Sequence, residues 1–291
     1  MEGVHAVLFA FFDAEGALDR AAMRAQVRAV AATGVDGVVT LGLATEVGKL
    51  SLEERLTLID WLAEDAGALP FAVTVTGNGI GEQRRILRAA ERAGAALAIL
   101  QPPLSGSYGA AELLDFFAAV GAGATIPLAV QNAPQFLGRS LAAADLVALR
   151  ARLPMLGHVK AEVAAVDLAA FIAGVGEGFT VLNGRGGLEM TDCLRADARG
   201  FVVAPDVAPG VVACWRAWQQ GDEEAAEAAY RRFLPAALFA MQSLEHLATY
   251  GKRIFARRAG LVVHDRAPAL RPTGFGLGLA GRWAAEGEAK T

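Results

Sequence analysis

Residues 156–163 have the sequence LGHVKAEV, a short apolar run that is typical of a buried strand and carries Lys160 near its end. The chain has only four lysines, and the other three lie in different surroundings. Lys49 is in a predicted loop, Lys252 is beside an arginine, and Lys290 is at the tail. Lys160 is therefore the lysine that we expect to be buried.

Burial of this lysine has a chemical consequence. An ammonium group loses hydration in an apolar environment, so burial favours the neutral amine. A neutral amine is a nucleophile for carbonyl carbon, and the position of Lys160 therefore predicts Schiff-base chemistry. The alternatives are a lysine that extends from the strand end towards solvent and a structural ion pair with Glu162.

Lys160 belongs to the sixth of eight short, β-rich apolar runs. These cover residues 4–11, 37–41, 71–76, 96–100, 128–131, 156–160, 180–182 and 201–204. Segments with helical periodicity alternate with them, at residues 19–32, 51–66, 82–93, 110–120, 142–152, 166–175, 188–196 and 209–220. The apolar runs are continuous, as in parallel strands buried on both faces. The pattern predicts an α/β fold, a (β/α)8 TIM barrel; a doubly wound sheet is the alternative, but no GxGxxG motif follows the first run.

The pattern changes to helices alone at about residue 222. We expect a long amphipathic helix at residues 222–250, for which a break at Pro235 is an alternative, and further helices at 252–259 and 278–288. The predicted division is a barrel at residues 1–221 and a C-terminal helical extension at 222–291. Such an extension caps a barrel or supplies an oligomer interface.

Composition limits the classes of partner. The net charge is −4, the pI is about 5.7 and no basic stripe is present, which argues against nucleic acid and anionic membranes. No run reaches the roughly 18 apolar residues of a membrane span. Two isolated cysteines and no signal-peptide pattern favour a reduced, cytoplasmic protein, and the four histidines show no metal-ligand spacing.

Polar or glycine-rich segments follow several predicted strands, at the end of a barrel where active sites lie. They are Gly42 to Glu46 after strand two, Gln131 to Pro134 after strand five, Lys160 to Glu162 at strand six, and Asn183 to Gly187 after strand seven. In this order and spacing the chain resembles the class I pyruvate aldolases typified by dihydrodipicolinate synthase and N-acetylneuraminate lyase. Their G-x-T-G-E, Y-N-x-P, G-x-K-(E) and S-G-D-D segments match these four positions in turn.

The resemblance implies a substrate and a way of holding it. Lys160 would form an imine with C2 of pyruvate or another 2-oxo acid, with no separate cofactor. The loop after strand two would hold the substrate carboxylate, which makes Leu43, Ala44 and Thr45 candidate binding residues. Gly184 and Val202, at strands seven and eight, complete the candidate set. Members of the family are commonly homotetramers, so we expect a homo-oligomer.

The chain departs from the family pattern at its proton relay. Gln131 replaces a tyrosine, and an amide forms hydrogen bonds but is not an acid–base group. Phe136 replaces the arginine that binds the second substrate's carboxylate in dihydrodipicolinate synthase, and Leu104 replaces a further tyrosine. Glu162 lies two residues beyond Lys160, on the same side of an extended strand, and is either an acid–base partner or a structural ion pair.

Other polar groups receive less specific predictions. Glu46 matches a family glutamate whose role is mostly structural, and His5 and His158 are expected to be barrel histidines without a catalytic role. Arg185 is a solvated loop residue or, alternatively, a ligand of the substrate carboxylate.

Three functions follow from these residues. The first is a lyase that forms a Schiff base at Lys160, an aldolase or dehydratase acting on a 2-oxo acid or a 2-keto-3-deoxy acid. The alternatives are an authentic dihydrodipicolinate synthase and a homologue that binds a 2-oxo acid without catalysis. Losses at Gln131, Phe136 and Leu104 argue against the synthase. Losses at Leu43, Ala44 and Gln131 favour the homologue without catalysis, and the retained Lys160 argues against it.

Overall fold

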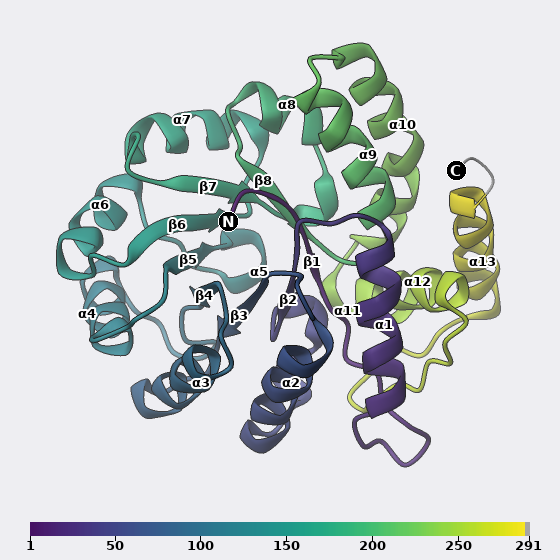
Figure 1. The fold of residues 1–291 in the computed structure, drawn as a ribbon, viewed down its shortest axis with the longest axis horizontal. Coiled ribbons are helices and arrows are strands. Elements are labelled where there is room, and N and C mark those ends of the chain that lie inside the picture. Colours follow the sequence, from purple (N-terminus) through teal and green to yellow (C-terminus); the bar gives the residue numbers. More distant parts are fainter. Residues whose placement is uncertain (289–291) are drawn as a thin grey trace.

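The computed structural model describes residues 1–288 and confirms the predicted barrel (Figure 1). Eight parallel strands form a closed sheet in sequential order, with β8 paired to β1. The strands are β1 (Gly3–Val7), β2 (Gly37–Thr40), β3 (Phe71–Val75), β4 (Leu97–Leu100), β5 (Leu128–Asn132), β6 (Leu156–Ala161), β7 (Thr180–Asn183) and β8 (Gly200–Val203). Almost every strand residue is buried, which explains why the runs are continuous rather than alternating.

Helices connect successive strands on the outside of the barrel (Figure 1). They are α1 (Arg20–Ala32), α2 (Leu52–Asp65), α3 (Ile80–Arg92), α4 (Ala110–Gly121), α6 (Ala143–Arg152), α7 (Ala165–Val175), α8 (Met190–Arg195) and, after β8, α9 (Ala208–Gln219). A one-turn helix that the sequence did not predict, α5 (Pro134–Leu137), follows β5. Short 3₁₀ turns, Leu43–Thr45, Val47–Lys49 and Arg185–Gly187, lie in the loops after β2 and β7.

The first strand is shorter than predicted. The apolar run at residues 4–11 was expected to be one strand, but β1 ends at Val7. Beyond Val7 the chain stays buried, and its backbone N–H groups donate to acceptors outside β1. The N–H of Leu8 donates to Val39, and that of Phe9 donates to the side chain of Gln26 on α1. A buried apolar run is therefore not always part of a sheet ladder.

The C-terminal helices also differ from the prediction. Helix α10 (Glu223–Ala240) continues through Pro235, and the chain bends instead at residues 241–243. Buried Phe233 and Ala237 lie on either side of the proline, and α10 packs along α9, so tertiary packing outweighs the loss of one backbone hydrogen bond. A new helix begins where the Ser243 hydroxyl accepts from the N–H of His246.

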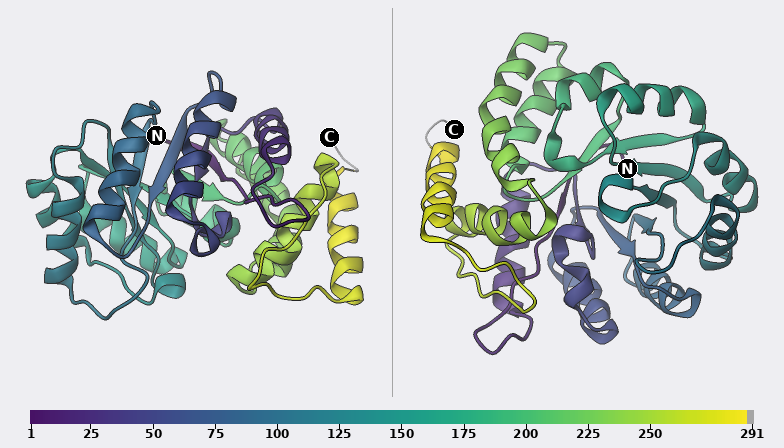
Figure 2. Two further views of the ribbon diagram at one scale, coloured as in Figure 1. Left: turned by 90° about the horizontal axis from the view of Figure 1, so that it is seen from below. Right: turned by 180° about the vertical axis from the view of Figure 1, so that it is seen from behind.

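The rest of the extension lies on one flank of the barrel (Figure 2). It comprises α11 (Leu244–His246), a π-helical turn at Leu247–Gly251, α12 (Lys252–Ala259) and α13 (Gly274–Glu288). Helix α12 contacts both α13 and α1. The domain division at residue 222 stays a prediction, and Lys290 lies outside the described residues. Over residues 1–288 no helix has the length and hydropathy to cross a membrane.

Candidate active site

Lys160 lies at the carboxyl end of β6 and is 5 % exposed. Its Nζ is 2.7 Å from Oε1 of Glu162, which is also buried. The Glu162 N–H donates to the carbonyl of Asn132, so the extended pairing with β5 continues past Lys160. This extension keeps the two side chains on the same side, as the two-residue spacing predicted. The pair joins an amine and a carboxylate that can exchange a proton directly.

Gln131 completes a three-residue group. It is the partner of Lys160 in the register between β5 and β6, and it is 1 % exposed. Its Nε2 donates to the same Glu162 oxygen at 2.9 Å. Its Oε1 has no hydrogen-bond partner within residues 1–288. The glutamine therefore orients the carboxylate and leaves one acceptor free.

A small inner cavity of about 30 Å³ opens onto this group. Lys160, Glu162 and Arg185 are the charged residues that line it. Most of the other lining residues are apolar, among them Val7, Leu43, Ala44 and Val202. The lysine amine thus faces a small cavity with both charged and apolar walls, where an imine would be shielded from bulk water.

The predicted binding residues fall into two groups. Leu43, Ala44 and Val202 line the inner cavity. Thr45 is fully buried, and its hydroxyl donates to the carbonyl of Leu8, so it fixes the loop after β2 rather than facing the cavity. Gly184 packs against Glu162, because a Cβ there would lie 2.8 Å from the Glu162 Cγ. Its lack of a side chain makes room for the carboxylate.

Arg185 is placed differently from our preferred prediction. It was expected to be solvated, but its side chain is only 14 % exposed and lines the inner cavity. Its Nη1 donates to Glu189 at 2.5 Å and to the carbonyl of Val163 at 3.2 Å. Arg185 and Glu189 both have positive φ, a conformation that non-glycine residues rarely adopt. Such outliers collect at functional sites, so the loop after β7 is a candidate part of this site.

Lys252 is a second buried lysine, contrary to the prediction from its polar neighbours. It is 1 % exposed and forms an ion pair with Glu46 in the loop after β2. Its Nζ also lies over the rings of Phe11 and Phe12. Burial lowers the pKa of the Lys252 ammonium, and the nearby Glu46 carboxylate opposes that shift. Glu46 binds Lys49 as well, which agrees with its predicted structural role.

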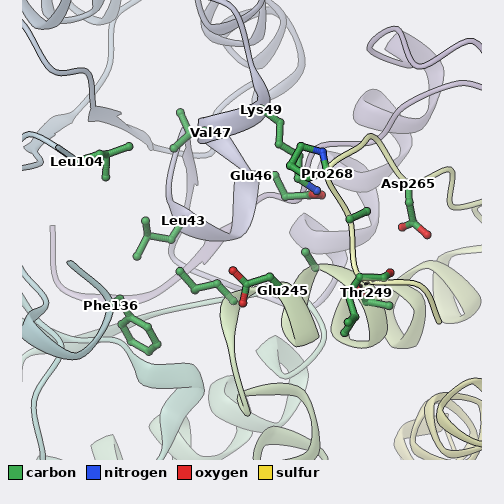
Figure 3. Close-up of a pocket in the computed structure, with 15 residues that line it drawn as sticks. Leu43, Glu46, Val47, Lys49, Leu104, Phe136, Glu245, Thr249, Asp265 and Pro268 are labelled. Atoms are coloured by element: carbon green, nitrogen blue, oxygen red, sulfur yellow. Dashed lines mark hydrogen bonds and ion pairs between the residues drawn. The ribbon is translucent and has the colours of Figure 1, made fainter. Parts of the chain in front are cut away.

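A larger outer cavity of about 580 Å³, whose lining residues are drawn in Figure 3, adjoins the inner one. The two share Leu43, Phe136 and Leu244. Leu104 also lines the outer cavity. Leu104 and Phe136, which replace a tyrosine and an arginine of the family pattern, therefore both line the cavity next to the one that contains Lys160.

The sequence did not indicate that the C-terminal extension contributes to the site. Met241, Leu244 and Leu247 line the inner cavity from the segment that follows α10. Nothing in their local sequence distinguishes them from other apolar helix residues. The bend at residues 241–243, which interrupts the helix predicted at 222–250, is what brings them there.

The barrel histidines lie away from this group. His158 is two residues before Lys160, and its Nε2 is 2.9 Å from the Met1 nitrogen. The Nε2 of His5 is 3.0 Å from the carbonyl of Glu2. Burial lowers the pKa of each histidine to about 4. Within residues 1–288 no group of three or more His, Cys, Asp or Glu side chains is arranged to hold a metal ion.

The protein is thus a (β/α)8 barrel with a buried lysine–carboxylate pair at the end of its sixth strand. The chain belongs to the dihydrodipicolinate synthetase family, whose model matches residues 1–271. This finding confirms the resemblance drawn from the four short motifs.

Relatives in this family carry two different activities in their names. The chain is 28 % identical to L-2-keto-3-deoxyarabonate dehydratase from Azospirillum brasilense, over 80 % of this chain and 77 % of that protein. It is 25 % identical to 4-hydroxy-tetrahydrodipicolinate synthase from Bradyrhizobium diazoefficiens, over 76 % and 75 %.

Solved structures share the fold. A putative dihydrodipicolinate synthetase from Pseudomonas aeruginosa is 23 % identical with a TM-score of 0.91, covering 98 % of this chain and 99 % of that one. YagE from E. coli K12, a protein of the same family described in complex with pyruvate, is 20 % identical with a TM-score of 0.89, covering 98 % of each chain.

Proposed function

We propose that this protein is a lyase that forms a Schiff base between Lys160 and a pyruvate-type 2-oxo acid. The observation that carries the proposal is the contact between Lys160 Nζ and Glu162 at 2.7 Å beside the inner cavity. A buried amine with an adjacent carboxylate has both the nucleophile and the proton acceptor that imine formation needs. Membership of the family and a structural neighbour described with pyruvate support the substrate class.

The first step balances with the groups present. Glu162 takes a proton from the Lys160 ammonium, and the neutral Nζ adds to C2 of the 2-oxo acid. The C2 oxygen gains two protons, one returned by Glu162 and one from the added Nζ, and leaves as water to give an iminium ion. The Glu162 carboxylate then takes a proton from C3, and the iminium nitrogen accepts the electron pair to give an enamine. Gln131 has no acid–base capacity and holds the Glu162 carboxylate through the 2.9 Å hydrogen bond.

Two outcomes are open to the enamine. In a dehydratase it expels the C4 hydroxyl, which takes a proton and leaves as water. In an aldolase its C3 attacks an aldehyde carbon, whose oxygen takes a proton, or the reverse reaction breaks that C–C bond. Water then hydrolyses the imine and restores the Lys160 amine. The replacement of the family tyrosine by Gln131 and of an arginine by Phe136 argues against authentic dihydrodipicolinate synthesis.

Two groups are placed to hold the carboxylate of the 2-oxo acid. Leu43 and Ala44 have no side-chain donors, but they open a 3₁₀ turn, where backbone N–H groups lack intrahelical acceptors. Arg185 is the second candidate, because it is the cation besides Lys160 that lines the inner cavity and its contacts to Glu189 and Val163 both use Nη1. We expect Arg185→Leu to raise the KM for the 2-oxo acid by about tenfold or more and to change kcat much less.

Borohydride reduction in the presence of pyruvate tests the proposal. Reduction of the imine leaves a carboxyethyl group on the lysine nitrogen, which peptide mass spectrometry locates. We expect the label on Lys160, and we expect none in a Lys160→Arg variant that folds normally. An unlabelled Lys160, under conditions that label a known Schiff-base aldolase, overturns the proposal. Label without turnover of any 2-oxo acid or 2-keto-3-deoxy acid would favour a binding protein instead.

A further inference from the structure

The outer cavity is large and adjoins the reacting lysine. Its volume of about 580 Å³ falls in the range of small-molecule sites. It shares Leu43, Phe136 and Leu244 with the inner cavity. A 2-oxo acid bound to Lys160 through C2 would therefore extend its distal carbons into the outer cavity.

The side of this cavity nearest the shared residues is apolar. Figure 3 shows Leu43, Leu104, Val47 and Phe136 together on one side of the pocket. Leu104 is 41 % exposed and so adds accessible apolar surface to this side of the cavity. These residues provide no hydrogen-bonding side chain to a distal substituent.

The charged residues of the outer cavity are three acids and one base. The acids are Glu46, Glu245 and Asp265, and the base is Lys49. Lys49 is already paired with Glu46 at 2.5 Å, and Asp265 binds Arg253 at 2.6 Å. Hydrogen bonds from its own backbone N–H and from Ser243 hold the pKa of Glu245 below its usual range, so it is an anion at neutral pH. Glu46 also pairs with buried Lys252, so Glu245 is the one lining acid without an ion-pair partner among the described residues, and the one lining cation is engaged.

We infer that the outer cavity selects 2-oxo acids whose distal part is an uncharged apolar group, such as an aryl ring or alkyl chain. An apolar group would cover Leu104 and Phe136. A distal carboxylate would meet the acidic lining without an unpaired lining cation to bind it. This inference rests on the proposed imine at Lys160 and adds the class of substituent that the imine carries.

Imine trapping measures this preference without requiring turnover. The protein would be titrated with 2-oxo-4-phenylbutanoate, 2-oxoglutarate and pyruvate, with borohydride added at each concentration, and the label at Lys160 quantified. We expect the phenyl acid to reach half-maximal labelling at a concentration at least about tenfold lower than 2-oxoglutarate. The variant Phe136→Arg should reduce or reverse that ratio, because it places a cation at the junction of the two cavities.

A matched control separates this local effect from a general change in charge. Val166 on α7 is 82 % exposed and lines neither cavity, so Val166→Arg adds the same charge elsewhere and should leave the ratio unchanged. Equal labelling by the two acids, or preference for 2-oxoglutarate, overturns the inference while labelling by pyruvate leaves the proposed function standing. Failure of pyruvate itself to label Lys160 overturns the proposed function and this inference with it.

Discussion

The protein contains two buried lysine–glutamate pairs, and they differ in what surrounds them. Lys160 and Lys252 are 5 % and 1 % exposed, and each contacts a glutamate. Lys160 lines the inner cavity, whereas Lys252 lies against two phenylalanine rings and lines neither cavity described above. Burial and pairing therefore do not identify a reactive lysine. Because Lys160 lines a cavity and Lys252 does not, our proposal gives the chemistry to Lys160 and a structural role to Lys252.

The largest expected effect on turnover comes from replacing the lysine that lines the inner cavity. Replacing Lys160 by Met should lower kcat for a 2-oxo acid substrate by at least about 10⁴-fold, because no other amine can form the imine there. Lys252→Met is the matched variant and should keep turnover within about tenfold at a temperature where it is folded. Steady-state kinetics on both variants tests this. Comparable losses in the two would contradict the assignment of separate roles.

The next effect concerns the two glutamates. Glu162→Gln keeps the shape of the side chain but removes its proton-transfer capacity, so we expect kcat to fall by about 10³-fold, or about 4 kcal/mol in activation free energy. Imine trapping by pyruvate should still occur, at a lower rate. Glu46→Gln is the control and should affect thermal stability more than kcat. A Glu162→Gln variant with normal turnover would leave Glu162 as a purely structural partner of Lys160.

Most of the fold could be predicted from the sequence because parallel strands buried on both faces leave continuous apolar runs. The same rule explains the error at residues 8–11, which are equally buried although β1 ends at Val7. There the N–H of Leu8 still donates to Val39 on β2, but that of Phe9 donates to the side chain of Gln26. In the C-terminal extension the predicted helix at 222–250 does continue through Pro235, where packing against α9 outweighs the local propensity for a break, but it ends at Ala240.

The Lys160 pair was predictable because both partners lie on one strand, where the two-residue period fixes their side. Glu46 and Lys252 are 206 residues apart, and only the tertiary fold brings them together. The polar neighbours of Lys252 in sequence gave the wrong indication, because α12 turns this one side chain towards Phe11 and Phe12. The inner-cavity residues from the extension were hidden for the same reason.

A smaller effect tests the structural role of Lys252. Lys252→Met leaves Glu46 buried with Lys49 as its remaining partner. Breaking a buried pair usually costs about 3–5 kcal/mol. Because Glu46 keeps its ion pair with Lys49, we expect the free energy of unfolding to fall by about 3 kcal/mol. Urea denaturation of the variant and of the exposed control Arg282→Met measures the difference in unfolding free energy. A variant as stable as the control would show that the Lys252 pair contributes nothing beyond an apolar side chain.

A further buried carboxyl, that of Asp206, lies beside the segment that carries Lys252. Asp206 follows β8, is 2 % exposed, and lies beside Gly251, where a Cβ would be 3.1 Å from its Oδ2. Burial raises the pKa of Asp206 from 3.8 to about 6, although the charge of Arg258 and backbone N–H groups act in the other direction. The folded protein therefore binds this proton more tightly than the unfolded chain. Its contribution to stability is largest below about pH 4 and is lost as the pH rises to about 6.

Asp206→Asn removes that pH dependence without changing the shape of the side chain. At pH 7.5 the variant should be more stable than the parent by up to about 3 kcal/mol, the equivalent of the shift between the two pKa values, and the gap should close near pH 4. Urea denaturation at both pH values measures the difference in unfolding free energy between the variant and the parent. A variant that is less stable at pH 7.5 would mean that Arg258 outweighs burial and that Asp206 is ionised. In that case the charge of Arg258 on α12 holds the Asp206 carboxylate ionised, which adds to the Lys252–Glu46 pair between the extension and the barrel.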